Sequence, residues 1–189
     1  MAPPAVESSF DVAYWFVDRA LDENEYLQPQ KLHRLMFLAQ AYFAVAYQRR
    51  LLMPAVFVAD EFGPIEPNVF RACSLQRPAI EPKALAEPVV HFLDSVWRRF
   101  GHHSAEYLSR QVNGHPPYRD ALAKGPRTVI TLPAMIEFYG KKASTTPEAS
   151  AAIGAPPVTQ VLRPRMMRSQ SGKPVSVQKW MPHAKKPPT

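Results

Sequence analysis

Apolar residues recur at helical spacing along most of the first 140 residues. Ser8 or Ser9 is placed to cap a first helix, with Asp11 near its positively polarised N-terminal end. A second helix is predicted over residues 30–47, and Pro29 suits its first turn because the missing amide hydrogen would have no partner there. Apolar side chains cover nearly the whole circumference of this second helix. It is therefore expected to be buried at the centre of the domain.

Shorter patterns follow, separated by turn signals. Ala55–Ala59 and Thr128–Ile130 are short and partly β-branched, which predicts two strands. Further helices are expected to begin at Pro67 and Pro88, with Gly101 as a left-handed stop after the second of them. The fold class expected is therefore mainly α: a compact multi-helix domain around the buried central helix, with a small β element.

Charge divides the chain at residue 140. Residues 1–140 carry 14 basic and 15 acidic side chains, whereas residues 141–189 carry nine basic and one acidic. The second segment also holds eight prolines, no Phe or Tyr and a single Trp, which is too little apolar surface to offset the entropy of ordering. We therefore expect one helical domain over 1–140 and a basic, proline-rich, disordered tail over 141–189.

Several classes of protein are disfavoured. The single cysteine, Cys73, excludes a disulfide framework and a multi-cysteine metal site. No apolar run approaches the roughly 20 residues that span a bilayer, and the N-terminus lacks the plan of a signal peptide, so a cytoplasmic protein without a membrane partner is expected. The common phosphate-binding, acyl-transfer and zinc-protease motifs are absent, so neither an enzyme nor a cofactor is expected. His102, His103 and His115 are interpreted as parts of a solvated loop and turn, not as metal ligands.

The most informative stretch runs from Asp60 to Phe70. In the simpler interpretation it only connects a strand to a helix through a turn at Gly63 and Pro64, with Ile65 and Phe70 anchored in the core. Alternatively, a loop made rigid by its prolines displays polar side chains to a basic partner. The residues expected to be architectural are Gly63, Pro64 and Pro67. The candidate partner-binding residues are Asp60, Glu61, Glu66, Asn68 and Phe70, together with a polar strip on the central helix, Gln30, Lys31 and Arg34.

The same two segments carry a resemblance to a known family. Gln28–Tyr42 reads QPQKLHRLMFLAQAY and Glu61–Phe70 reads EFGPIEPNVF. Together they resemble the Panacea domain, the family of SocA-like antitoxins and phage-associated proteins. Later stretches also resemble its pattern and stand in its order: Leu93–Gly101, Ser104–Ser109 and Pro117–Ala121. The resemblance covers roughly residues 11–139 and departs from the common residues at Arg34, Phe37 and Tyr118.

The resemblance implies a bacterial antitoxin that neutralises a toxin, encoded next to it, by direct protein–protein binding. Some SocA-like members are thought to act as proteolytic adaptors that deliver the toxin to a Clp-type ATP-dependent protease. The family is not known as enzymatic and implies no cofactor.

The basic tail leaves three interpretations open. It is a functionally indifferent extension, or it wraps a toxin, or it binds nucleic acid through counterion release and base stacking. The nucleic-acid regulator is the less favoured alternative to an antitoxin, because no recognition helix accompanies the charge. The candidate contact residues in the tail are Arg163, Arg165, Arg168 and Trp180.

Overall fold

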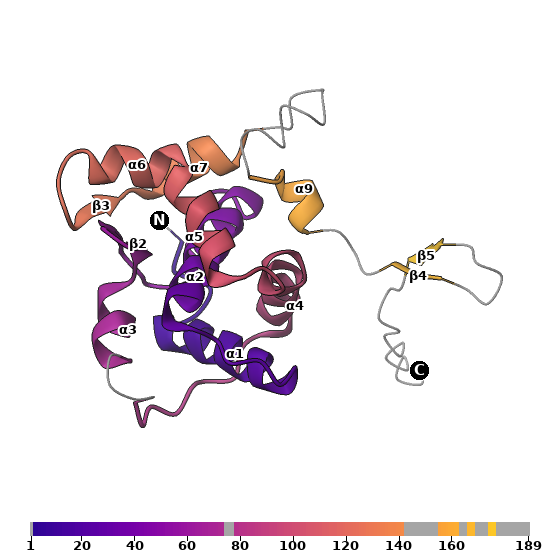
Figure 1. Ribbon diagram of the computed structural model, residues 1–189. Helices are drawn as coiled ribbons and strands as arrows, with labels where there is room; N and C mark the ends of the chain where they lie inside the picture. Colours follow the sequence, from indigo (N-terminus) through magenta and orange to yellow (C-terminus); the bar gives the residue numbers. More distant parts are fainter. Residues whose placement is uncertain (1, 74–77, 142–154, 163–165, 169–173, 177–189) are drawn as a thin grey trace, which may run out of the picture.

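The structure is a computed structural model that describes residues 2–73, 78–141 and 155–162, and the backbone of residues 166–168 and 174–176. Its centre is helix α2 (Pro29–Ala46), from which Lys31 through Ala44 are all buried. Around it lie α1 (Ser9–Asp22), α4 (Glu87–Val96), α5 (Ala105–Gly114) and α7 (Leu132–Tyr139), each in contact with α2 (Figure 1). Two shorter helices complete this part of the domain, α3 (Pro67–Ala72) and α6 (Pro116–Leu122). The expected mainly α domain around a buried central helix is confirmed.

Helix α1 begins as the sequence predicts, with Ser8 as its N-cap. The Ser8 hydroxyl accepts a hydrogen bond from the amide of Phe10 at 3.1 Å, and the Asp11 carboxylate accepts one from the amide of Ser8 at 3.2 Å. This reciprocal capping satisfies amides that a helix start leaves without partners. The second oxygen of Asp11 accepts a bond from the amide of Lys83 at 2.9 Å. The same carboxylate therefore fixes the irregular segment before α4.

A three-stranded antiparallel sheet lies beside these helices, in the order β2-β1-β3. β1 (Phe57–Asp60) and β3 (Thr128–Ile130) correspond to the two predicted strands, and Val58 pairs with Val129. The turn predicted at Gly63 and Pro64 is instead the start of β2 (Gly63–Ile65), which forms a hairpin with β1. The hairpin turn therefore lies just before the predicted position, at Glu61 and Phe62.

Gly101 does not have the expected role of a left-handed helix stop. It ends the π-helical turn η1 (Trp97–Gly101), and Gly63 and Gly125 are the described glycines with positive φ. Gly101 is instead in close contact with the indole of Trp97, so that a Cβ added to it would lie 2.6 Å from Cδ2. Glycine is required here for close packing, because any side chain would overlap the ring.

Part of the segment that the composition predicts to be disordered belongs to the domain. The short helix α9 (Val158–Val161) contacts α2, and Val161 is only 3% exposed within the hydrophobic core. The hydroxyl of Tyr42 donates a hydrogen bond to the carbonyl of Pro156 at 2.7 Å. Residues 155–162 were assigned to the tail because proline and basic side chains surround them, whereas their few apolar side chains are enough to pack on α2.

Two further strands in the same segment, β4 (Met166–Arg168) and β5 (Pro174–Ser176), pair in antiparallel fashion. Of the predicted tail contacts, Arg168 is described only as backbone in β4, and Arg163, Arg165 and Trp180 lie outside the described residues. Within the described part of the chain, no helix has the length and apolar character needed to cross a membrane.

Candidate protein-binding site

The buried polar side chains of α2 each hold a connecting segment of the chain. Lys31 forms an ion pair with Glu25 in the loop before α2, and its ammonium lies 5.7 Å from the centre of the Trp97 ring. The Gln40 carboxamide accepts hydrogen bonds from the amides of Leu52 and Met53, each at 3.1 Å. Buried polar groups are costly unless they are bonded, and here the bonding partners are the loops that enter and leave the helix.

Arg34 holds the β1–β2 hairpin in the same way. Its side chain is only 1% exposed, and its guanidinium donates to the carbonyl of Pro64 at 3.0 Å and to the carbonyl of Phe62. Burial lowers the pKa of Arg34 to about 10, a shift that Tyr118 and Asp60 oppose. The group therefore stays cationic at neutral pH. Hydrogen bonds from a charged donor contribute about 1.5–3 kcal/mol each, so these two strongly restrain the hairpin turn.

Two other helices restrain the same turn. The Asn113 side chain of α5 donates to the carbonyl of Phe62 at 3.4 Å, and the Tyr118 hydroxyl of α6 donates to the carbonyl of Asp60 at 2.6 Å. Three carbonyls of the turn region are thus bonded to side chains of three different helices, which fixes the direction of its backbone. Figure 1 shows β2 beside α5 at this end of the domain.

Gly63 is the residue that permits this approach. Its φ of +125° lies in the region that favours glycine, and an added Cβ would lie 2.2 Å from Nη2 of Arg34 and 2.6 Å from Oδ1 of Asn113. A side chain at this position would therefore have to displace the two groups that hold the turn.

The start of α3 is held by a second residue of α2, His33. The amide of Glu66 donates to Nδ1 of His33 at 3.3 Å, and the Glu66 carboxylate accepts from the amide of Val69 at 2.7 Å and from the Asn68 side chain at 3.1 Å. Burial, and secondly the charge of Arg34, lowers the pKa of His33 to about 4. The imidazole is consequently neutral at pH 7, with its hydrogen on Nε2 because Nδ1 accepts.

The structure separates the candidate residues into interior and surface groups. Lys31, Arg34 and Glu66 are buried and are therefore wrong as partner-contacting residues. Polar side chains at a helix start commonly face water, which is the basis of the prediction, whereas here Lys31 and Arg34 bond to connecting segments and Glu66 caps α3. The predicted residues that do reach the surface are Gln30, Glu61, Asn68 and Phe70, with Asp60 half-buried. Gly63 and Pro64 are buried in the hairpin, and Pro67 occupies the first turn of α3.

Two aromatic side chains dominate what the segment exposes. Phe70 is 47% exposed on α3, so it is not the core anchor that the simpler interpretation requires, although its ring lies 5.9 Å from that of His33. Phe62, which the sequence interpretation missed, is 62% exposed in the hairpin turn. The signal for it was present, since a large aromatic between Asp60-Glu61 and Gly63-Pro64 belongs to no periodic apolar pattern.

An apolar cavity of about 350 Å³ opens beside Phe70, between α1, the start of α2 and α3. Its lining is mainly hydrophobic, and the neutral His33 ring forms part of it. Cys73 contributes to this lining and packs against the core. Val17, Tyr26 and Leu32 are among the other residues that line it.

Metal binding has no support among the described residues. None of their His, Cys, Asp and Glu side chains form a group of three that could hold an ion. The interpretation of the three histidines as solvated is wrong for His115, which is 4% exposed and forms a hydrogen bond of 2.8 Å between Nδ1 and the Tyr139 hydroxyl. His102 is exposed, and His103 is partly buried.

We predict that the substitution Gly63→Ala lowers the free energy of unfolding by about 2 kcal/mol or more. The added methyl group would overlap Arg34 and Asn113 and would also force an L residue to keep a positive φ. Urea denaturation followed by circular dichroism measures the change. The matched control is Gly114→Ala, where an added Cβ meets no atom within 4 Å and φ is not positive. An equal midpoint for the Gly63 variant and the wild type would contradict the described packing of the turn.

Comparison of the chain with known protein families, with curated proteins and with solved structures gives no match. The resemblance of its motifs to the Panacea domain therefore stays a prediction. The structural feature that bears on function is a surface with two exposed aromatic rings on a restrained connector, next to an apolar cavity.

Proposed function

We propose that this protein is an antitoxin that neutralises a toxin by direct binding through the segment Asp60–Phe70. The observation that carries the proposal is the exposure of Phe62 on a backbone that Arg34 and Asn113 hold in place. Protein interfaces take most of their binding energy from a few residues, among which large aromatic side chains are prominent. A turn that is already ordered loses little entropy when it binds, so the aromatic contact is not offset by ordering.

The chemistry of the partner surface follows from what is exposed. With Glu66 buried and Asp60 half-buried, Glu61 is the exposed carboxylate of the segment. The interface proposed is accordingly apolar at its centre, with one charge contact, and differs from the acidic surface expected from the sequence. The toxin would offer a pocket to Phe62 and a basic side chain to Glu61.

The cavity beside Phe70 supports a second contact, in which this protein would receive a side chain of the toxin. It is large enough for an apolar side chain of the toxin, and its mouth is bordered by Phe70 and by Tyr26, which is 76% exposed. Burying one large apolar side chain contributes roughly 1.5–3 kcal/mol. That the partner is a toxin rests on the resemblance of the motifs Gln28–Tyr42 and Glu61–Phe70 to the SocA-like antitoxins.

We predict that Phe62→Ser weakens binding of the toxin encoded by the adjacent gene by roughly 30-fold or more, as expected for a central aromatic contact. The fold should be unaffected because the side chain is exposed. Copurification followed by a calorimetric titration measures the affinity. Val129→Ser, which also removes an exposed apolar side chain but from β3, is the matched control and should bind as the wild type does. Unchanged binding by the Phe62 variant, or no complex with the wild type, would refute the proposal.

The proposal also gives the tail a role: it would deliver the bound toxin to a Clp-type ATP-dependent protease, so that the protein acts as an adaptor. Residues 163–189 carry seven basic and no acidic side chains, whereas residues 1–162 carry 16 of each. The whole net charge of +7 thus lies beyond α9. A basic segment with so few apolar side chains is the type of sequence that an ATP-driven protease can engage.

We predict that a chain ending at residue 162 binds the toxin like the full chain but no longer supports its degradation. The truncation retains Val161 and the bond from Tyr42 to Pro156, so the domain keeps its packing. Toxin half-life in cells that express each chain measures the effect. A half-life equal to that with the full chain would assign no adaptor role to the tail.

A further inference from the structure

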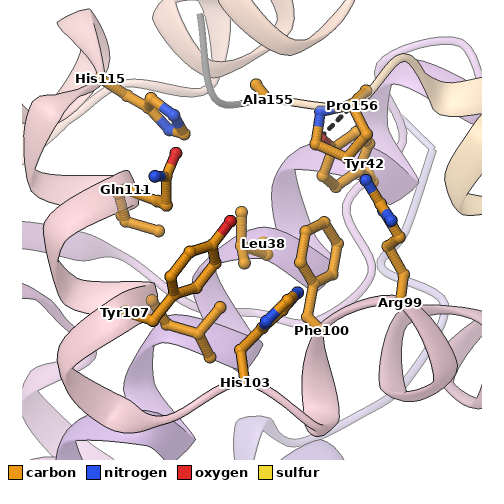
Figure 2. A pocket seen from close by; sticks show the side chains of 12 residues that line it. Leu38, Tyr42, Arg99, Phe100, His103, Tyr107, Gln111, His115, Ala155 and Pro156 are labelled. Carbon is orange, nitrogen blue, oxygen red and sulfur yellow. Dashed lines mark hydrogen bonds between the residues drawn. The ribbon is translucent and has the colours of Figure 1, made fainter. Parts of the chain in front are cut away.

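A second, smaller pocket lies between η1, α5 and the segment that precedes α9 (Figure 2). Four polar residues that line it, His103, Tyr107, Gln111 and His115, follow one another at intervals of four. This spacing places them along one side of α5 and its flanking residues. Arg99 of η1 completes the polar lining. None of these residues belongs to the segment Asp60–Phe70.

Some of the polar groups around the pocket are already engaged and form its walls. The Tyr42 hydroxyl bonds to the Pro156 carbonyl, as the dashed line in Figure 2 shows, and His115 bonds to Tyr139. The others have no such role. Within the described part of the chain, neither the Arg99 guanidinium, the Tyr107 hydroxyl nor the Gln111 carboxamide forms a hydrogen bond or ion pair. Arg99 and Tyr107 are exposed, so donors that no described protein group engages border the pocket and can reach a ligand in it.

Comparison with the neighbouring Arg98 shows that the lack of a protein partner is specific to position 99. Arg98, in the same turn, pairs with the Asp94 carboxylate at 3.1 Å and donates to the Ser95 hydroxyl at 3.1 Å. Arg99 lines the pocket instead. π-helical turns, which are rare, occur frequently at functional sites, and here the turn presents one arginine to a carboxylate of the protein and the next to a cavity.

The electrostatic environment favours an anion. No Asp or Glu is present among the described residues that line the pocket. The pKa of His103 is lowered firstly by burial and then by the charges of Arg99, His102 and Lys31. The charged groups of described residues that act on this ring are therefore basic. Within this part of the chain, a ligand carboxylate would meet a positive region without a competing acid.

The size and the apolar wall of the pocket further restrict which ligands can fit. The cavity has a volume of about 40 Å³, which is room for a group of only a few atoms. Its remaining lining is apolar and comes from Leu38, Phe100, Leu108 and Val112. We propose that this pocket binds a small carboxylate with a short apolar stem, with Arg99 as the pairing cation and Tyr107 and Gln111 as further donors. The planar guanidinium matches a carboxylate in two parallel bonds, and the apolar wall suits a hydrocarbon stem better than the fourth oxygen of a phosphate.

The test is a calorimetric titration of the full chain with propionate at low ionic strength. Saturable binding to one site is expected, with roughly millimolar affinity for a ligand of this size. The uncharged isostere propionamide should not bind, and phosphate should bind more weakly than propionate. Arg99→Gln should weaken propionate binding roughly tenfold or more through loss of charge-assisted bonds. Arg98→Gln is the matched control and should stay within about twofold of the wild type.

Gln111→Leu provides a second variant, which should weaken binding without any change of charge. Both pocket variants are compared by their unfolding midpoints, which should equal that of the wild type because Arg99 and Gln111 make no bonds with the described protein residues. Absence of saturable propionate binding, equal losses for the Arg98 and Arg99 variants, or phosphate binding as tight as propionate would each overturn the proposal. None of these results bears on toxin binding, since the two sites share no residue.

Discussion

The buried guanidinium of Arg34 is the interaction on which the arrangement of the proposed binding surface depends. A charge in the interior must be paired or hydrogen-bonded, and this one is bonded to two main-chain carbonyls of the β1–β2 hairpin, those of Phe62 and Pro64. If the hairpin moved away, the Arg34 charge would stay buried without its hydrogen-bond partners, which typically costs about 3–5 kcal/mol. The close approach of the guanidinium to the hairpin then requires glycine at position 63, next to the exposed Phe62.

Helix α2 extends this principle to the whole domain. It is buried along most of its length, so its polar residues need partners in the interior, and each finds them in a connecting segment. Helix α9 packs on the same helix. The two proposed sites meet at α5, whose Asn113 bonds to the hairpin and whose Gln111 lines the smaller pocket. A single helical framework thus positions both the proposed protein-binding segment and the separate, proposed carboxylate pocket.

Much of the framework follows from the sequence, because periodicity and capping are local properties. The all-round apolar pattern of residues 30–47 predicts the central helix, and Ser8 with Asp11 predicts the start of α1. The direction of Arg34 does not follow, since a polar residue near a helix start has the same pattern whether it meets water or a carbonyl. Likewise, Val161 packs on a helix distant in sequence, and Gly101 is fixed by the Trp97 ring. These features depend on tertiary contacts that no local pattern encodes.

Amide hydrogen exchange of an Arg34→Lys variant tests the central claim most directly, because lysine keeps the charge but cannot bond to both carbonyls in the same fork. The account predicts that exchange of the β1–β2 amides accelerates roughly tenfold or more, as expected for loss of about one charged hydrogen bond. The amides of Leu52 and Met53, held by Gln40 instead, are the internal reference and should exchange as in the wild type. Unchanged exchange in the hairpin would contradict the claim that Arg34 holds the binding segment in place.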